Sequence, residues 1–367
     1  MGAGTAQRGA CLLISGKVRK NMEFVVFAGV LLLLFIFMIV QELIQTKNQE
    51  KLFKKYLREN YGKEPPKEYS LERFARLGSY LERHKEEKQL DDITWNDLGM
   101  DEVFRRIDRT YSAAGEEYLY YTLRNISCGR EALEHLEEVV NWLQEQENIK
   151  VRIQLLMKRL GHLGKYSLYD YLDNLDYLGE RSNRKIVLGN LLYLPFLLLL
   201  FVQPAMGTIG IVLCMLWHIM TYFREKKVIE PYIISFAYVL RLIDVCEELE
   251  KQKIPVYRRE LDELREVLKS LRELRRGAYW VMAGNQGKIG GNPLDILADY
   301  LRMILHLDIF QFNRMLEKLR KKTGQVETML AITGYLDMAI SVGGFRKSLE
   351  GYCIPKLEED TEKVFCI

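Results

Sequence analysis

The residues from which metal sites are built are present in this sequence but are scattered. There are five histidines and no HExxH arrangement. They are His84, His135, His162, His218 and His306. Asp295 and Asp299 lie one turn apart on a predicted helix, with Asp308 farther along, and paired carboxylates can hold a divalent ion. Pairing with Arg302 or with solvent is the simpler interpretation, so we nominate no metal ligand.

A phosphate-binding loop and a nucleic-acid surface are each suggested by one segment. The segment Gly284–Lys288 has glycines and a lysine, but Ile289 stands where a phosphate loop needs Ser or Thr, so a connection between helices is favoured. One further segment interleaves aromatic and basic residues, namely Tyr118, Tyr120, Tyr121 and Arg124. Helical spacing divides them between two faces, which favours packing over stacking on bases. We therefore nominate no catalytic and no cofactor-binding residue, and we predict no small-molecule substrate.

The composition excludes several classes of protein. The chain has 367 residues, of which 48% are hydrophobic, and its 53 basic and 50 acidic residues leave a net charge of +3. Such a chain is too apolar for intrinsic disorder and too balanced in charge for a dedicated polyanion binder. Six cysteines without regular spacing exclude a disulfide scaffold.

Three apolar segments predict transmembrane helices and make a lipid bilayer the expected partner. Phe24–Val40 has seventeen residues without a polar side chain, or roughly 26 Å of helix. Ile186–Val202 and Ala205–Phe223 flank the uncharged turn Gln203-Pro204 and predict a hairpin; a buried core hairpin is the alternative. A histidine within a span, in this case His218, is a candidate functional residue. A neutral imidazole bonded to a neighbouring helix is the favoured interpretation.

The basic residues beside the spans predict the orientation of the chain. Arg181, Arg184 and Lys185 precede the hairpin, and Arg224, Lys226 and Lys227 follow it. The positive-inside rule then places both soluble blocks on the cytoplasmic side of a cytoplasmic (inner) membrane, as a multi-pass protein. Basic residues ahead of the first span conflict with this orientation, and a translation start at Met22 would resolve the conflict.

The soluble blocks are predicted to be all-α. Short amphipathic helices are expected over Asp101–Arg109 and Gly115–Arg124, and longer ones over Arg130–Leu160 and from Leu294 to about Lys322. Apolar residues at alternating spacings of three and four run from Ile254 to Leu271 and again from Val326 to Ile340, ending at Gly343-Gly344. Such narrow stripes indicate long helices that pack lengthwise as antiparallel arms.

One part of the chain resembles the membrane-anchored branch of the MutS (DNA mismatch repair) family. The resemblance begins at Asp91–Ile126, in which six positions match: Thr110, Ala113, Gly115, Leu119, Leu123 and Arg124. It continues over Arg130 to Leu163, where the family has an arginine near the position of Arg152. It returns near the end at Leu336–Ala339 and Tyr352–Pro355. In total it covers roughly Asp92–Leu178 and Val228–Leu357.

The resemblance implies a helical core with long lever helices that transmit movement between a DNA clamp and an ATPase domain. With the apolar spans, it divides the chain into six parts. The first three are an N-terminal segment with the first span (1–44), a charged helical linker (45–91) and the first half of the core (92–180). The last three are the transmembrane hairpin (186–223), the second half of the core with the levers (228–357) and a tail that begins the ATPase domain (358–367). ATP, Mg²⁺, DNA and a homodimer are implied only for the full-length protein. Phe223-Arg224-Glu225 matches the family's mismatch-reading Phe-x-Glu by chance, since it ends a span. The alternative function is a membrane-anchored helical scaffold or adaptor without a DNA or nucleotide role.

Overall fold

The computed structural model describes residues 36–41, 43–63, 69, 71–85, 88–126, 129–163, 167–275 and 293–353. These residues are helical almost throughout, and the only backbone pairing of β type among them is the isolated bridge between Gln89 and Asn125. The predicted all-α class is therefore confirmed.

The chain divides into two compact units, Met1–Lys55 with Lys288–Ala298, and Tyr56–Gly287 with Asp299–Ile367. The first unit contributes helical residues 36–41, 43–55 and 293–298.

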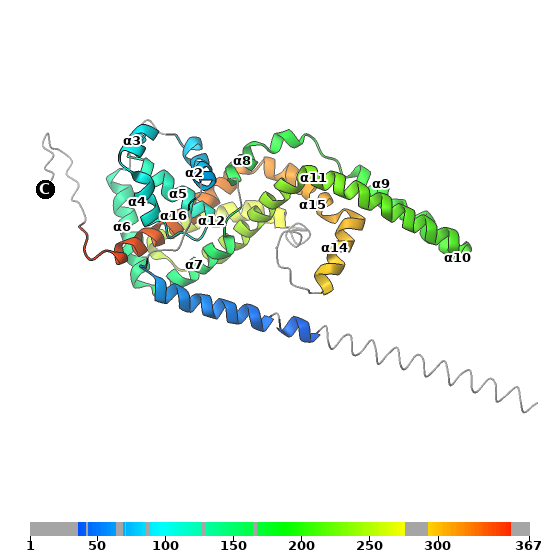
Figure 1. Cartoon of the computed structure of the whole chain (residues 1–367), viewed down its shortest axis with the longest axis horizontal. Helices are drawn as coiled ribbons and strands as arrows, with labels where there is room; N and C mark the ends of the chain where they lie inside the picture. The colour runs from blue at the N-terminus through cyan, green and yellow to red at the C-terminus, as the bar shows by residue number, and fades with distance from the viewer. Residues whose placement is uncertain are drawn as a thin grey trace, which may run out of the picture. The chain divides into compact units, whose positions relative to one another are not determined.

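The helices of the second unit form one body (Figure 1). The first half contains α2 (Leu71–Arg83), α3 (Asp92–Asp97), α4 (Met100–Ile107), α5 (Ala113–Arg124), α6 (Arg130–Glu145), α7 (Glu147–Leu160), α8 (Leu168–Asp173) and η1 (Leu175–Leu178). The second half contains α9 (Arg184–Leu191), α10 (Tyr193–Val202), α11 (Pro204–Glu250), η2 (Pro255–Tyr257), α12 (Arg258–Leu271), η3 (Arg272–Arg275), α14 (Pro293–Leu305, of which 299–305 belong to this unit), α15 (Leu307–Arg320) and α16 (Thr323–Ser348).

Helix α16 lies at the centre of the core and packs against α5, α6, α7 and α12. Its stripe Val326, Met329, Thr333, Leu336 and Ile340 is at most 2% exposed, as the spacing predicted. Small residues let α5 and α16 approach closely: a Cβ on Gly334 would lie 2.6 Å from the Ala114 carbonyl oxygen. The two halves of the chain therefore share one hydrophobic core.

The second stripe belongs to α12 and the turn before it, and it packs antiparallel to α16. The Tyr257 hydroxyl donates to the Ile332 carbonyl at 3.1 Å, while Lys322, at the start of α16, donates to the Ser270 carbonyl near the end of α12. The predicted antiparallel arrangement of Ile254–Leu271 and Val326–Ile340 is thus confirmed. The helix predicted over Ile254–Leu271 is shorter than predicted, because Pro255 starts a separate 3₁₀ turn and α12 begins only at Arg258.

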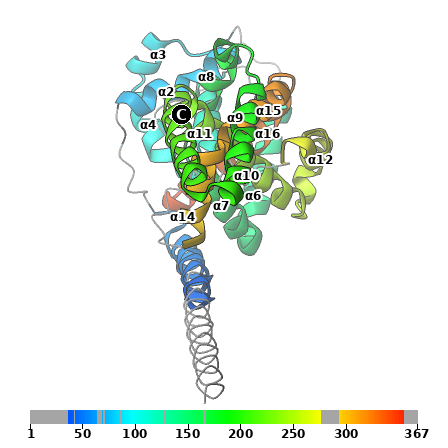
Figure 2. The same cartoon turned by 90° about the vertical axis from the view of Figure 1, so that its right-hand side faces the viewer.

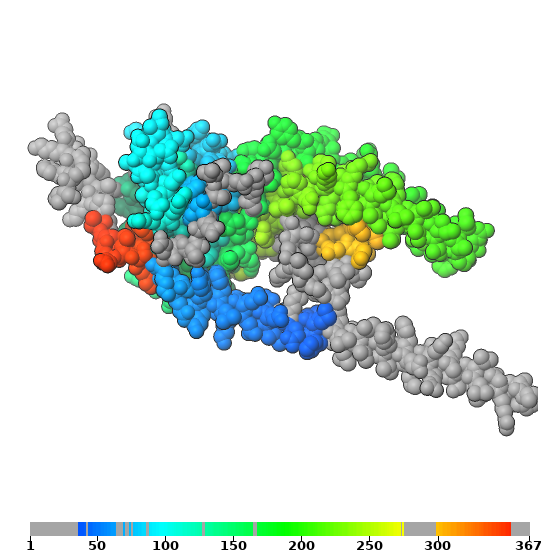
Figure 3. Space-filling view, in the orientation of Figure 1, coloured from blue at the N-terminus to red at the C-terminus, as the bar shows by residue number. Residues whose placement is uncertain are grey.

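Helices α9, α10 and α11 form the predicted hairpin, which projects from the core (Figures 1 and 3). From the tip to the base, the facing pairs are Leu200 with Gly207, Phe196 with Gly210, Gly189 with His218, and Arg181 with Glu225. The first arm is interrupted at Leu192, because Pro195 has no N–H to donate and its ring clashes with the carbonyl one turn earlier. In the view that looks toward the hairpin, the two arms lie side by side (Figure 2).

Three helices among the described residues are long and apolar enough to cross a membrane: Arg184–Val202, Pro204–Glu250 and Thr323–Ser348. The first two contain the predicted hairpin. Only 6% of the apolar window of the first is buried, which indicates membrane association, whereas 72% of that of Thr323–Ser348 is buried in the core. The predicted span Phe24–Val40 lies outside the described residues except for 36–40.

Several predicted boundaries were wrong. Arg130–Leu160 is two helices divided at Gln146, and the helix predicted from Leu294 to about Lys322 is divided at His306, whose φ of 54° is left-handed. Helix α16 continues through Gly343-Gly344 to Ser348. These glycines serve packing rather than termination, because a Cβ at either position would press on Tyr61 or Arg109. Helix α11 runs through residues 223–228 without a break, so the predicted hairpin and the predicted second half of the core share one helix.

Helix α2 was predicted to lie in a linker, but it packs on α5 as part of the core. Its Leu77 is fully buried beside Phe104 and Leu119. Phe74 and Leu81 of the same helix are partly buried against this cluster. The Pro65-Pro66 break lies outside the described residues.

Candidate functional site

The two polar residues that interrupt the inner face of the hairpin meet one corner of the core. The Asn190 side-chain amide donates to the Leu305 carbonyl at 3.1 Å, and His218 Nδ1 lies 3.4 Å from His306 Nδ1. Leu305 ends α14 and His306 precedes α15. The last carbonyls of a helix have no partner inside that helix, so a cap is needed when the helix ends in apolar surroundings. We name Asn190, His218, Leu305 and His306 the hairpin corner.

The hairpin corner continues toward the core as a chain of hydrogen bonds. The Thr221 hydroxyl lies 3.3 Å from His306 Nε2, and the Tyr222 hydroxyl donates to the Asp308 carboxylate at 2.8 Å. Lys226 in turn donates to the Tyr222 hydroxyl at 3.0 Å. These contacts join α11 to the start of α15 over two helical turns.

Burial keeps His306 uncharged. His218 is 1% exposed and His306 is 5% exposed. Desolvation, followed by the nearby His218, lowers the pKa of His306 to about 4, so the ring is neutral at pH 7. One Nδ1 carries the shared hydrogen and the other accepts it. The predicted bond from the His218 imidazole to a neighbouring helix agrees with its 3.4 Å contact to His306. His218 Nε2 and Asn190 Oδ1 are buried without a partner among the described residues.

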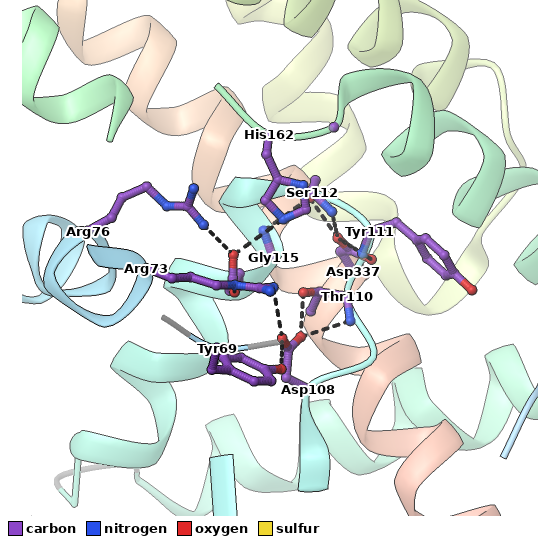
Figure 4. A network of polar contacts seen from close by, with 12 residues as sticks. Tyr69, Arg73, Arg76, Asp108, Thr110, Tyr111, Ser112, Gly115, His162 and Asp337 are labelled. Carbon is purple, nitrogen blue, oxygen red and sulfur yellow. Dashed lines mark hydrogen bonds and ion pairs between the residues drawn. The ribbon is translucent and has the colours of Figure 1, made fainter. Parts of the chain in front are cut away.

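A second polar cluster lies inside the core and is centred on three buried carboxylates (Figure 4). Asp337 of α16 accepts hydrogen bonds from the Ser112 hydroxyl at 2.6 Å, from the Ser112 N–H at 2.8 Å and from the Tyr111 N–H at 3.0 Å. Ser112 is also the N-cap of α5, since its hydroxyl accepts from the Gly115 N–H at 3.1 Å. Asp337 thereby fixes the start of α5 against the middle of α16.

Glu116 and Asp108 attach α2 to the same place. Glu116 is an ion-pair partner of both Arg73 and Arg76, the latter at 2.7 Å, and His162 Nε2 lies 3.3 Å from its carboxylate. Asp108 accepts from the Thr110 hydroxyl at 2.6 Å and from the Tyr69 hydroxyl at 2.5 Å. These donors all come from the chain itself, which is how buried carboxylates are stabilised in a fold.

Two adjacent glutamates of α5 have opposite shifts in pKa. Burial raises the pKa of Glu116, but the hydrogen bond and charge of His162, and then Arg73 and Arg76, outweigh burial and lower it to about 2. Glu117 is equally buried, and its direct partner among the described residues is the Ser167 hydroxyl at 3.0 Å. Burial therefore dominates and raises the pKa of Glu117 to about 8. At pH 7 the first is a carboxylate and the second carries its proton.

The remaining histidines, which were considered as metal ligands from the sequence, are packing residues in the structure. His84 lies 3.1 Å from the Tyr80 carbonyl, His135 stacks on Tyr257 and Tyr335, and His162 pairs with Glu116. Among the described residues, no three His, Cys, Asp or Glu side chains are grouped as metal ligands would be.

The structure also describes some of the other residues that were considered as ligands or binding residues. Asp299 pairs with Arg302 at 2.9 Å, as expected. The side chain of Asp295 and the segment Gly284–Lys288 lie outside what the structure describes. Arg124 packs over Trp95 and Tyr120 and pairs with Asp92 at 2.7 Å, so these aromatic and basic residues are used in the core, as their helical spacing predicted.

The sequence analysis missed Asn190, Asp337 and Glu116. Asn190 and Asp337 are polar residues in otherwise apolar stretches, and that pattern is a usable signal of a buried partner, whereas Glu116 stands beside Glu117 and gives no such signal. The identity of the partner was not accessible, since Asp337 and Ser112 are 225 positions apart.

Among known proteins, no protein-family model, no curated protein and no solved structure matches the chain.

Proposed function

We propose that this chain is the membrane-tethered core and lever portion of a MutS-like DNA mismatch repair family ATPase. In this proposal it relays ATP-driven movement between an ATPase domain and the bilayer. ATP, Mg²⁺ and the contact with a second copy would belong to that ATPase domain, and mismatched DNA is a ligand only by the family resemblance.

The observation that carries the proposal is the continuity of α11. A single helix of 47 residues contains the second arm of the hairpin and then the most buried stretch of the core, from Ile233 to Leu249. At 1.5 Å per residue it is roughly 70 Å long. A continuous helix of that length couples its core end to its membrane end, with Pro231 between them removing one hydrogen bond of the helix. The hairpin corner adds a second attachment between the hairpin and α15.

The contact between Asp337 and Ser112 supports the family part of the proposal. Ser112 lies in the first segment that carries the resemblance and Asp337 in the last, and the two segments form one cluster. Helices α12 and α16, which the resemblance implies to be levers, pack antiparallel beside it.

The position of the charges supports the proposed orientation on the cytoplasmic face of an inner membrane. Four exposed basic residues surround the base of the hairpin: Arg184, Lys185, Arg224 and Lys227. From the tip at Gln203 to Arg224 is roughly 30 Å of helix, which is the thickness of the hydrocarbon core. The basic residues would then lie at the level of the lipid head groups.

Hydrogen exchange on the protein extracted from its native membrane tests the relay. With and without ATP and Mg²⁺, we expect the exchange of α12, α16 and residues 299–313 to change together. In an Asn190→Leu variant the change at 299–313 should disappear while that in α12 remains. The relay is refuted if ATP alters no exchange and a photoreactive ATP analogue labels neither this polypeptide nor a co-purifying one.

The scaffold alternative predicts a different outcome with DNA. Its support is that three carboxylates buried in the described core, Asp108, Glu116 and Asp337, are satisfied by donors of the chain itself, as in a purely structural body. A gel shift with the full chain in detergent, using mismatched duplex DNA at increasing salt, separates the two functions. Binding that weakens steeply with salt favours the MutS-like proposal, and no binding at low salt favours the scaffold.

A further inference from the structure

The first turn of α7 buries a lysine that has no acidic partner among the described residues. Lys150 is 5% exposed, and its ammonium lies 3.7 Å from the centre of the Tyr61 ring. No ion pair joins it to an acid in the described part of the chain. Desolvation lowers the pKa of Lys150, and the charge of Lys347 lowers it further, while the charge of Glu147 acts in the opposite direction. A cation near a helix N-terminus also opposes the helix dipole, so the fold alone gives no reason for a charge at this position.

Lys347 brings a second positive charge to the same ring. It lies in the last turn of α16, its side chain is exposed, and its ammonium is 5.3 Å from the centre of the Tyr61 ring. Gly62, at a φ of +92°, packs directly against the Lys347 side chain and holds it there. The neighbouring Arg346 is paired with Glu137 at 2.6 Å, whereas Lys347 forms no ion pair among the described residues.

The result is a small site with two ammonium groups, one nearly buried and one at the surface, above the start of a helix. Like charges this close repel each other, and an anion between them removes both the repulsion and the uncompensated burial. Carboxylates are stabilised by ammonium groups and by the N-terminus of a helix. The site therefore has the chemistry of a carboxylate receptor.

We propose that the acidic segment of this same chain at residues 358–362 occupies the Tyr61–Lys150–Lys347 site. That segment contains four acids in five residues: Glu358, Glu359, Asp360 and Glu362. Lys347 is followed along the chain by only ten residues before the first of these acids, and an extended chain covers at most about 3.5 Å per residue. The first of these acids is therefore always within about 40 Å of Lys347, and the last within about 55 Å.

The occupied site links the end of α16 to the segment that follows it. Lys347 belongs to the central helix and Lys150 to α7, so a bound carboxylate joins two core helices to the departing chain. The direction in which the chain leaves the core would then be fixed by charge. This inference stands on the basic site and the acidic run, and does not depend on the proposed ATPase role.

Zero-length cross-linking of the full chain in detergent tests the inference. Carbodiimide joins a lysine to a carboxylate only when the two are in contact, and mass spectrometry identifies the joined peptides. We expect the peptide with residues 358–362 to be joined to Lys347, to Lys150 or to both. Exposed Lys253 serves as the reference. Cross-links from 358–362 to other lysines only, or at the same level to Lys253, would overturn the inference.

A mixture of ¹⁴N- and ¹⁵N-labelled protein distinguishes the source of the carboxylate. Cross-links within one isotope label confirm the same chain as the occupant. If mixed-isotope peptides form in proportion to the mixture, the acids come from a second copy and the inference is wrong.

A variant with Glu358→Gln, Glu359→Gln, Asp360→Asn and Glu362→Gln gives an independent measurement. Loss of the carboxylates should raise the acetylation rate of Lys150 and Lys347 by about tenfold, because a nearby opposite charge moves a pKa by about 1. Lys253 should be unchanged. If both lysines react equally in the variant and in the natural protein, and 50 mM phosphate, roughly physiological in ionic strength, protects them in both, the site takes a free anion and the proposed occupant is wrong.

Discussion

The Asn190 side chain caps the carbonyl of Leu305 at 3.1 Å, across 115 positions of sequence. Asn190 stands in the first arm of an apolar hairpin, and Leu305 is the last residue of a core helix. The bond therefore attaches the segment predicted to lie in the membrane to the helical body at the end of α14, where the last carbonyls have no partner inside their own helix.

Replacing Asn190 by leucine should weaken this attachment. Leucine has nearly the same size but no donor, so the part-buried Leu305 carbonyl would lose this hydrogen bond, at a cost of about 1 kcal/mol. Thermal unfolding in detergent should show a lower midpoint for Asn190→Leu. Thr208→Val is the matched control, because the Thr208 hydroxyl is exposed and donates only within its own helix, to the Pro204 carbonyl. Equal midpoints for the two variants would show that the cap has no effect on stability.

A methyl group on Gly115 should disrupt the crossing of α5 and α16. The new Cβ would lie 2.6 Å from Asp337 Cβ, closer than real contacts, so we expect Gly115→Ala to destabilise the fold by about 1–3 kcal/mol. Gly324→Ala, in the first turn of α16, meets no atom within 4 Å and should be stabilising by up to about 1 kcal/mol. Urea unfolding of the two variants should therefore give shifts of opposite sign, and shifts of the same sign would contradict the close approach.

Glu117 should make the protein less stable as the pH rises. Its pKa is about 8 in the fold and near 4.3 in the unfolded chain, so the unfolded state releases the proton first. Between these values stability falls with increasing pH, by up to about 5 kcal/mol in total before relaxation of the site. Glu117→Gln mimics the protonated side chain and should remove this slope. Unfolding midpoints at pH 5 and pH 8 test this, and a slope that survives in the variant excludes Glu117 as its source.

Glu116 should behave in the opposite way. Because its pKa is lowered to about 2, its contribution is complete above the unfolded pKa and is lost as the pH falls from about 4.3 toward 2. Glu116→Gln leaves Arg73 and Arg76 without their shared carboxylate and should cost about 3–5 kcal/mol at pH 7. Below pH 3 the difference from the natural protein should narrow, as measured by circular dichroism. A constant difference across that range would mean that the ion pairs contribute nothing.

The hairpin and the apolar stripes of α12 and α16 could be predicted because their patterns are local. The apolar runs on either side of Gln203-Pro204 and the stripes through Leu264 and Leu336 need no tertiary information, since burial follows the helical period. The interruption at Leu192 could also have been found, because Pro195 marks it.

The breaks at Gln146 and His306 could not be predicted, because glutamine and histidine interrupt no helix by themselves. His306 is held at a positive φ by contacts with His218 and Thr221, which lie more than eighty positions away. The cluster around Asp337 is a similar case. An aspartate within an apolar stripe announces a buried partner, but only the folded chain identifies Ser112.

Accessibility of the hairpin tip tests the central claim most directly, namely that residues 184–223 cross a bilayer as a hairpin with the core on its cytoplasmic side. Single cysteines are placed at Gln203 and at Lys227 in chains without other reactive thiols. We expect a membrane-impermeant maleimide to label Gln203→Cys on intact cells stripped of their outer layers, and Lys227→Cys only after lysis. Labelling of both positions only after lysis, with the protein released by carbonate wash, would contradict the account.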